Sequence, residues 1–73
     1  MDNFYDKLAE VLEVDEVKSS DNLKELPEWD SLSVLSLIAM VHATYGVTLN
    51  ARELRSADTA QQVYELIGQK LGN

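Results

Sequence analysis

The chain has no cysteine, a single proline and only three glycines among its 73 residues. Without cysteine it can form no disulfide, perform no thiol catalysis and offer no thiolate to zinc. Its single histidine leaves little room for a transition-metal site. Hydrophobic residues make up 45% of the sequence, so the scarcity of proline and glycine favours a folded helical domain over a disordered chain.

Basic residues are also scarce, because 6 Lys and Arg stand against 13 Asp and Glu and leave a formal net charge of -7. A nucleic-acid-binding module needs a basic surface, so this balance excludes one. The acidic excess is confined to residues 1–30, where ten acidic residues outnumber three basic ones, whereas residues 31–73 carry three of each. We expect the acidic part to be mainly a solvated surface, with the alternative that it steers basic partner surfaces toward the chain.

Long apolar stretches are missing as well. The longest unbroken apolar run, residues 37–41, is far shorter than the ~20 residues of a membrane span. Residues 1–7 are acidic and lack the basic-then-apolar order of a signal peptide. We therefore expect one domain over residues 1–73, located in the cytoplasm, without membrane contact and monomeric.

The spacing of the apolar residues predicts helices and no strands. A first amphipathic helix is expected over about residues 2–14. Turn-forming residues and the proline then indicate a long connection over residues 15–29. We expect Val17, Leu23 and Leu26 to anchor this connection in the core. A loop of this length in a small domain is unusual and often functional.

A second helix is predicted over residues 31–45, with clear signals at both ends. Asp30 is a good N-cap, because its side chain can accept a backbone N–H from Leu32 or Ser33. Gly46 follows the last predicted turn, where glycine commonly ends a helix. This helix is the longest that the sequence predicts.

Two further helices are expected in the remainder of the chain. Asn50 and Glu53 form a capping-box pattern at the start of a short third helix. The fourth helix is predicted to open at Asp58, with Gln61 three residues later, and to close at Gly72. The expected fold is all-α, a small bundle of three main helices plus one short helix. The residues predicted to form its core are Phe4, Leu8, Leu12, Leu37, Val41, Val63, Ile67 and Leu71.

The second helix carries no Asp, Glu, Lys or Arg on either side when its residues are placed at intervals of about 100°. The side predicted to face the core carries Val34, Leu35, Leu37, Ile38, Val41 and Tyr45. The opposite side carries no charge and consists of Leu32, Ser33, Ser36, Ala39, Met40, Ala43 and Thr44. In an acidic chain such a face favours a docking surface for a partner, with Leu32 and Met40 as its apolar contacts. The alternative is a helix that packs on both sides within the domain.

Ser31 directly follows the predicted cap, in a first turn whose N–H groups and helix dipole favour an anion. A serine there can carry a phosphate or phosphodiester, with an ordinary cap-region serine as the alternative. A catalytic role is not expected, because His42 would lie about 16 Å away along the helix axis. We therefore predict no enzyme and no metal site, and expect His42 at the solvent edge or at an interface.

The segment Asp30-Ser31-Leu32, at the head of a long helix and after a long loop in an acidic chain, resembles the acyl carrier proteins. The resemblance covers nearly the whole chain and includes Asn22-Leu23, Glu28-Trp29, Tyr45-Gly46-Val47 and Thr59-Ala60-Gln61. It implies that a phosphopantetheinyl transferase joins 4′-phosphopantetheine from coenzyme A to Ser31, using magnesium. The thiol of this arm would hold an acyl group as a thioester, and the domain would present that cargo to other enzymes without catalysis of its own.

The resemblance also implies roles for the neighbours of Ser31. Asp30 would lie where the transferase and its metal act, Leu32 would belong to the docking surface, and an acyl chain could shelter among the core residues. The chain departs from the family in two respects. Trp29 stands where a smaller residue is common and would cover the arm or extend the docking surface. Uncharged residues replace the acids that fatty-acid carriers bear along the second helix, namely Ser33, Ser36, Ala39, His42 and Ala43.

These departures argue against general fatty acid synthesis and favour a specialised fatty acid or polyketide pathway. The implied partners are the transferase and an acyl-loading ligase or synthase. The predicted docking surface comprises Trp29, Leu32, Ser36, Ala39, Met40 and Ala43. Two alternatives stay open: a stand-alone aminoacyl or peptidyl carrier, which uses the same serine and arm, and a small helical adaptor that is not a carrier.

Overall fold

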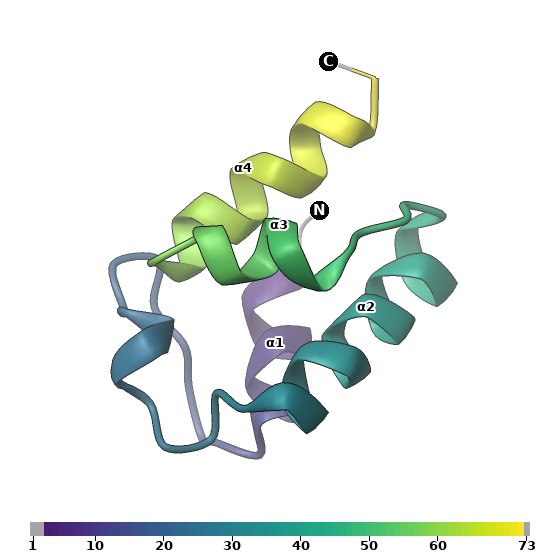
Figure 1. The fold of residues 1–73 in the computed structure, drawn as a ribbon. Helices are drawn as coiled ribbons and strands as arrows, with labels where there is room; N and C mark the ends of the chain where they lie inside the picture. Colours follow the sequence, from purple (N-terminus) through teal and green to yellow (C-terminus); the bar gives the residue numbers. More distant parts are fainter. Residues whose placement is uncertain (1–2, 73) are drawn as a thin grey trace.

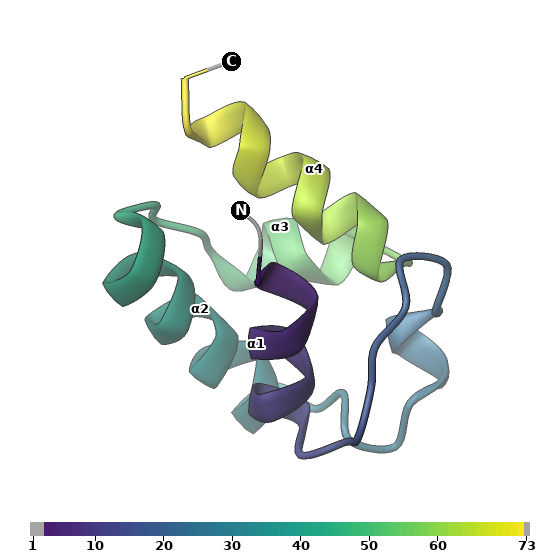
Figure 2. The same ribbon diagram turned by 180° about the vertical axis from the view of Figure 1, so that it is seen from behind.

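The computed structural model describes residues 3–72, which form helices joined by loops (Figures 1 and 2). The α-helices are α1 (Phe4–Leu12), α2 (Ser31–Tyr45), α3 (Ala51–Ser56) and α4 (Ala60–Lys70), and a short 3₁₀ helix, η1 (Leu23–Glu25), lies in the connection between α1 and α2. Residues 3–72 contain no strand, although Asn22 and Thr59 form an isolated antiparallel bridge. The predicted all-α fold of three main helices and one short helix is confirmed. Asp2, the first residue of the predicted first helix, lies outside the described residues.

The helices pack around one core. The α2 helix packs against both α1 and α3, and α4 lies across the end of the molecule where α1 begins (Figures 1 and 2). Contacts between aromatic rings join α1 to α4. Tyr5 and Tyr64 stack with their ring centroids 5.6 Å apart, and Phe4 meets Tyr64 edge-on at 5.9 Å. Such pairs add stability beyond the burial of their area.

The long connection before α2 is bonded to the start of α4. The carbonyl of Asp21 accepts from the Ala60 N–H at 3.1 Å, and the carbonyl of Ser19 accepts from the Gln61 N–H at 3.0 Å. The first N–H groups of a helix have no acceptor within the helix. Carbonyl groups of the connection supply these acceptors at the start of α4. It is therefore an ordered part of the fold and holds the segment that leads into α2.

The core is built from every helix and from the connection. Its fully buried side chains include Phe4, Leu8, Leu23, Leu37, Val41, Leu54, Val63 and Ile67. Of the predicted anchors, Val17 and Leu23 are buried and Leu26 is half-buried. The placement of Leu71 in the core was wrong, because α4 ends at Lys70 and leaves Leu71 45% exposed. The other seven residues named for the predicted core are buried.

The end of α1 differs from the prediction. The helix stops at Leu12 because Glu13 takes a left-handed conformation with a φ of 58°. The N–H of Val14 then bonds back to the carbonyl of Ala9 at 3.0 Å, which closes the turn in the manner of a Schellman motif. Glycine is the usual residue at such a position, so a glutamate there carries conformational strain.

The start of α4 is also shifted by one residue. Thr59 is the N-cap, not Asp58 as predicted, and Gln62 takes the place expected for Gln61. The Thr59 hydroxyl accepts from the Gln62 N–H, and the Gln62 side chain accepts from the Thr59 N–H. At α3 the cap by Asn50 is confirmed.

The buried side of α2 is rotated by about 60° around the helix axis from the predicted one. Leu35 was placed in the core but is 61% exposed, whereas Ser33 is buried and Met40 is half-buried against the core. The α2 helix packs against α1 and α3, and its buried residues are Ser33, Val34, Leu37 and Val41. Hydropathy could not find that side, because α2 is apolar all round.

The rotation can be tested with two leucines of α2 that differ in burial. Leu37→Ala should lower the free energy of unfolding by about 2–5 kcal/mol, because it leaves a cavity in the core. Leu35→Ala, the matched control on the exposed side, should change it by less than about 0.5 kcal/mol. Urea unfolding followed by circular dichroism measures both. Equal losses at the two positions would contradict the orientation of α2.

Candidate functional site

The first turn of α2 is held by reciprocal hydrogen bonds between Asp30 and Ser33. The Asp30 carboxylate accepts from the Ser33 N–H at 2.9 Å, and the Ser33 hydroxyl accepts from the Asp30 N–H at 2.9 Å. The same hydroxyl donates to the Asp30 carbonyl at 3.0 Å. This capping box confirms the predicted cap and fixes the residue at which α2 begins. Because the Ser33 hydroxyl is hydrogen-bonded in this way, it can be buried without leaving an unpaired polar atom.

Ser31 is the serine of this turn that points outward. It is exposed, and within residues 3–72 its hydroxyl makes no hydrogen bond. The Ser33 hydroxyl is buried and engaged with Asp30, and Ser36 lies more than one turn further along the helix. The positive end of the helix dipole favours an anion at Ser31. An exposed hydroxyl there fits the covalent attachment of a phosphate ester.

The side of α2 next to Ser31 is an exposed, uncharged face. Leu32 is 72% exposed and Leu35 is 61% exposed. The other exposed members that the sequence predicted are Ser36, Ala39 and Ala43. The sequence reasoning missed Leu35, although the capping box turns Ser33 inward and would have placed Leu35 outward. We call Leu32, Leu35, Ser36, Ala39 and Ala43 the α2 face.

Two further residues of the predicted surroundings, Met40 and Trp29, lie off this face, whereas His42 lies at its edge, one turn after Ala39. Met40 was expected to point away from the core, which was wrong, because its side chain is half-buried and packs against the core. Trp29 is also half-buried against the core, in the turn just before the cap. His42 is exposed on α2, in agreement with the predicted position at the solvent edge.

A groove runs beside the start of α2, between this helix and the end of α1. Its volume is about 250 Å³. Val11, Leu12 and Leu32 give it apolar walls, and Glu13, Glu28 and Asp30 give it carboxylates, with Ser33 and Ser36 completing the lining. We call it the α1–α2 groove. It adjoins Ser31 directly, because Asp30 and Leu32 are the chain neighbours of that residue.

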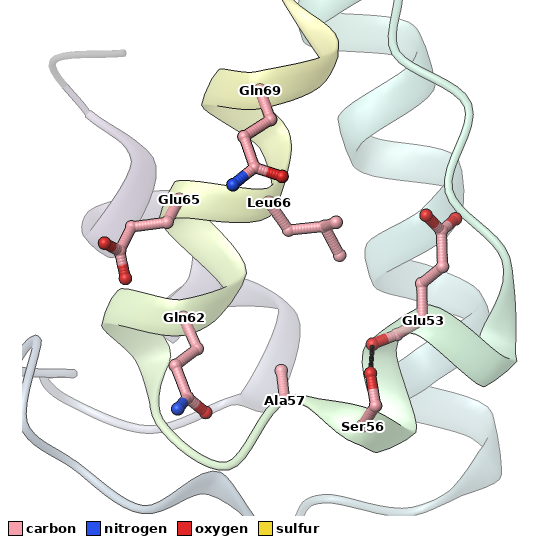
Figure 3. A pocket seen from close by; sticks show the side chains of 7 residues that line it. All are labelled: Glu53, Ser56, Ala57, Gln62, Glu65, Leu66 and Gln69. Carbon is pink, nitrogen blue, oxygen red and sulfur yellow. Dashed lines mark hydrogen bonds between the residues drawn. The ribbon is translucent and has the colours of Figure 1, made fainter.

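A second cavity, of about 270 Å³, lies between α3 and α4 (Figure 3). Five of its seven lining residues have polar side chains, and Lys70 forms an ion pair of 2.9 Å with one of the lining carboxylates, Glu53. The hydrogen bond from Lys70 lowers the pKa of the Glu53 carboxyl below its usual value. The two lining residues with apolar side chains are Ala57 and Leu66.

Residues 3–72 contain no group of three or more His, Asp or Glu placed to hold a metal ion. Within the same residues, no helix is long and apolar enough to cross a membrane. The chemistry near Ser31 is that of a hydroxyl at a helix start, beside an uncharged face and an acidic groove that share Leu32 and Ser36.

Comparison with known proteins identifies the class to which such a site belongs. Residues 3–67 match the family described as "Phosphopantetheine attachment site". The chain is also 37% identical over 68 residues to the "Polyketide-8 synthase acyl carrier protein 2" of Streptomyces avermitilis, a match that covers 90% of this chain and 78% of that protein. No solved structure matches the chain significantly.

The chain belongs to the acyl carrier protein family of phosphopantetheine-binding domains. Members of this family bind 4′-phosphopantetheine and carry acyl groups for other enzymes, so the protein is a carrier and not a catalyst. The alternative of a helical adaptor that carries no cargo is thereby excluded. The exposed Ser31 hydroxyl and the favourable helix dipole are the features that fit the prosthetic group.

The contribution of the cap can be measured by replacing Asp30. Asp30→Ala removes the side-chain acceptor of the Ser33 N–H and should lower the free energy of unfolding by about 1 kcal/mol. Asp30→Asn keeps a good capping side chain without the charge and should stay within a few tenths of a kcal/mol of the original. Thermal unfolding followed by circular dichroism checks both. An unchanged midpoint in Asp30→Ala would show that the cap is not formed.

Proposed function

We propose that this protein carries acyl intermediates on 4′-phosphopantetheine attached to Ser31 and presents them to partner enzymes through the α2 face. The observation that supports it is the exposed hydroxyl of Ser31 at the capped start of α2, next to two exposed leucines. A phosphopantetheinyl transferase, acting with magnesium, transfers the group from coenzyme A. When bound, the arm supplies a thiol that holds the cargo as a thioester.

The residues around Ser31 have separate tasks in this proposal. Asp30 holds the first turn of α2 in place through its bonds with Ser33, so the Ser31 hydroxyl is presented from a rigid element. The first-turn N–H groups and the helix dipole partly compensate the negative charge that a phosphodiester adds. Asp30 is also the chain neighbour of Ser31, the residue that would react, where the transferase and its metal would work.

Partner enzymes are proposed to dock on the α2 face. Leu32 and Leu35 are the largest exposed apolar side chains of α2, and the small residues Ala39 and Ala43 let a partner approach the helix closely. No Asp or Glu occurs in α2. Contact with this face would therefore be apolar, as expected for the centre of a protein interface. Leu35 replaces Met40 in the surface predicted from the sequence, and half-buried Trp29 forms its edge.

The cargo and setting are part of the proposal. The relative from Streptomyces avermitilis is by its name an acyl carrier of a polyketide synthase, so we favour polyketide-type acyl groups loaded by a ligase or synthase. The protein would act as a monomer in the cytoplasm. Loading reactions with acyl and aminoacyl donors distinguish this proposal from an aminoacyl or peptidyl carrier.

The attachment site is tested by mass spectrometry after incubation with coenzyme A and a broad-specificity phosphopantetheinyl transferase. Ser31→Ala should abolish the mass increase of one phosphopantetheine while the helical circular dichroism stays unchanged. Thr44→Ala is the matched control, since it removes another exposed hydroxyl of α2 that lies outside the α2 face, and it should be modified normally. Modification that survives in Ser31→Ala, or is lost in Thr44→Ala, would contradict the assignment.

The docking face is tested with its two leucines. Leu32→Ser and Leu35→Ser should each raise the KM of the transferase for the carrier by about tenfold, because a central apolar contact is lost. The rise should persist at high salt, since apolar contacts are not screened. Leu71→Ser is the control, an equal change at an exposed leucine outside α2. A similar rise in the control would show that the α2 face is not the docking surface.

A further inference from the structure

Trp29 is the one tryptophan of the chain, and it stands two residues before Ser31. A short turn fixes its backbone, because the N–H of Trp29 donates to the carbonyl of Leu26 at 3.0 Å. The side chains of Leu26 and Trp29 are half-buried and pack against the core. From Trp29 to Ser31 the chain can span at most about 7 Å. The indole ring is therefore carried by backbone that lies close to the proposed attachment site.

The fold uses the apolar body of this side chain and leaves its polar group unused. Within residues 3–72 the indole N–H of Trp29 donates no hydrogen bond, and Tyr45 Oη is the one buried side-chain polar atom without a partner. The indole nitrogen is therefore accessible to solvent. Among the same residues, the ring of Trp29 contacts no other aromatic ring. Because tryptophan N–H groups in folded proteins usually find a partner, this one is available to a group that binds from outside.

The charges around Ser31 favour the surroundings of Trp29 over the α1–α2 groove for a bound phosphopantetheine arm. The chain neighbours of Trp29, Glu28 and Asp30, line the groove, whereas Trp29 does not. The phosphodiester of the arm is an anion, and the carboxylates of the groove repel it. The indole carries no charge. It offers a donor for the oxygens of the arm and an apolar ring for its hydrocarbon segments.

We propose that Trp29 holds the phosphopantetheine arm near the surface of the domain: its indole N–H donates a hydrogen bond to an oxygen of the arm, and its ring covers the adjoining part of the arm. This inference rests on the proposed function, because it concerns a group attached at Ser31. Of the two roles that the sequence left open for Trp29, it selects the covering of the arm.

The tether at Ser31 favours the arm over a partner enzyme as the group that binds the indole. A group attached two residues away stays at a high local concentration around Trp29, so a single hydrogen bond is enough to hold it. The turn from Leu26 and the capping bond to Ser33 already fix the backbone on both sides of Trp29. The contact therefore requires little further ordering of the protein.

The test uses nuclear magnetic resonance of the isotope-labelled chain, which gives a single indole N–H signal because Trp29 is its one tryptophan. The signal is recorded before and after modification with coenzyme A and a broad-specificity phosphopantetheinyl transferase. Modification should slow the exchange of the indole proton with water by about two- to tenfold, the range expected for one net hydrogen bond. Nuclear Overhauser effects should also join this proton to the arm. Ser31→Ala, treated in the same way, is the control and should show neither change.

Trp29→Phe separates the hydrogen bond from the packing of the ring. It keeps an apolar aromatic side chain in the turn and removes the N–H donor. The arm of the modified variant should become more mobile, so the transverse relaxation of an isotope-labelled arm should slow, while the helical circular dichroism and the extent of modification stay unchanged. Tyr64→Phe is the matched control, because it removes a polar group from another half-buried aromatic residue, in α4. It should leave the relaxation of the arm as in the original.

The outcomes distinguish a failure of this inference from a failure of the proposed function. If the original protein is not modified, or if Ser31→Ala is still modified, the proposed function fails. If Ser31 is modified but the indole proton exchanges as fast as before and shows no Overhauser effect to the arm, only the role of Trp29 fails. Equal mobility of the arm in Trp29→Phe and in the original would overturn it as well. So would an indole signal that changes only when the transferase binds the unmodified protein, because the partner enzyme would then be the group that contacts Trp29.

Discussion

The reciprocal hydrogen bonds between Asp30 and Ser33 are the constraint on which the rest of the site depends. They fix where α2 begins and turn Ser33 toward the interior. Because successive side chains of a helix lie about 100° apart, the direction of one residue sets the direction of the others. Ser31 and the leucines at positions 32 and 35 are thereby turned to the solvent, so the hydroxyl proposed for attachment lies beside the proposed docking face.

The distribution of charge gives this side of the molecule two distinct parts. The α2 face is uncharged, whereas the preceding thirty residues hold ten of the chain's acidic residues, and three of these line the groove beside Ser31. Charged groups at the rim of an interface mainly steer and orient the encounter, whereas buried apolar contacts mainly set how long it lasts. The uncharged α2 face and the acidic α1–α2 groove meet at Leu32 and Ser36, which belong to both.

The sequence predicted the starts of α2 and α3 and singled out Ser31 because these signals are local. A cap, a turn glycine and a capping box involve residues within one turn, so the start of α2 could be placed from Asp30 and its end from Gly46. The side of α2 that faces the core could not be predicted from such local signals. Leu35 was wrongly assigned to the core and Ser33 to the surface. The start of α4 was missed for a related reason. Asp58 and Thr59 are both good caps, and a hydrogen bond from Ala60 to the distant connection accompanies the second of them.

The central claim is that the capping box leaves Ser31 as the one hydroxyl of this turn open to modification. Tandem mass spectrometry of the unmutated protein, after transfer from coenzyme A, tests it most directly because it reads the modified residue itself. The account predicts one phosphopantetheine on Ser31 and none on Ser33 or Ser36. A group found on Ser33 would contradict the account, since that hydroxyl is buried and bonded to Asp30 in the structure.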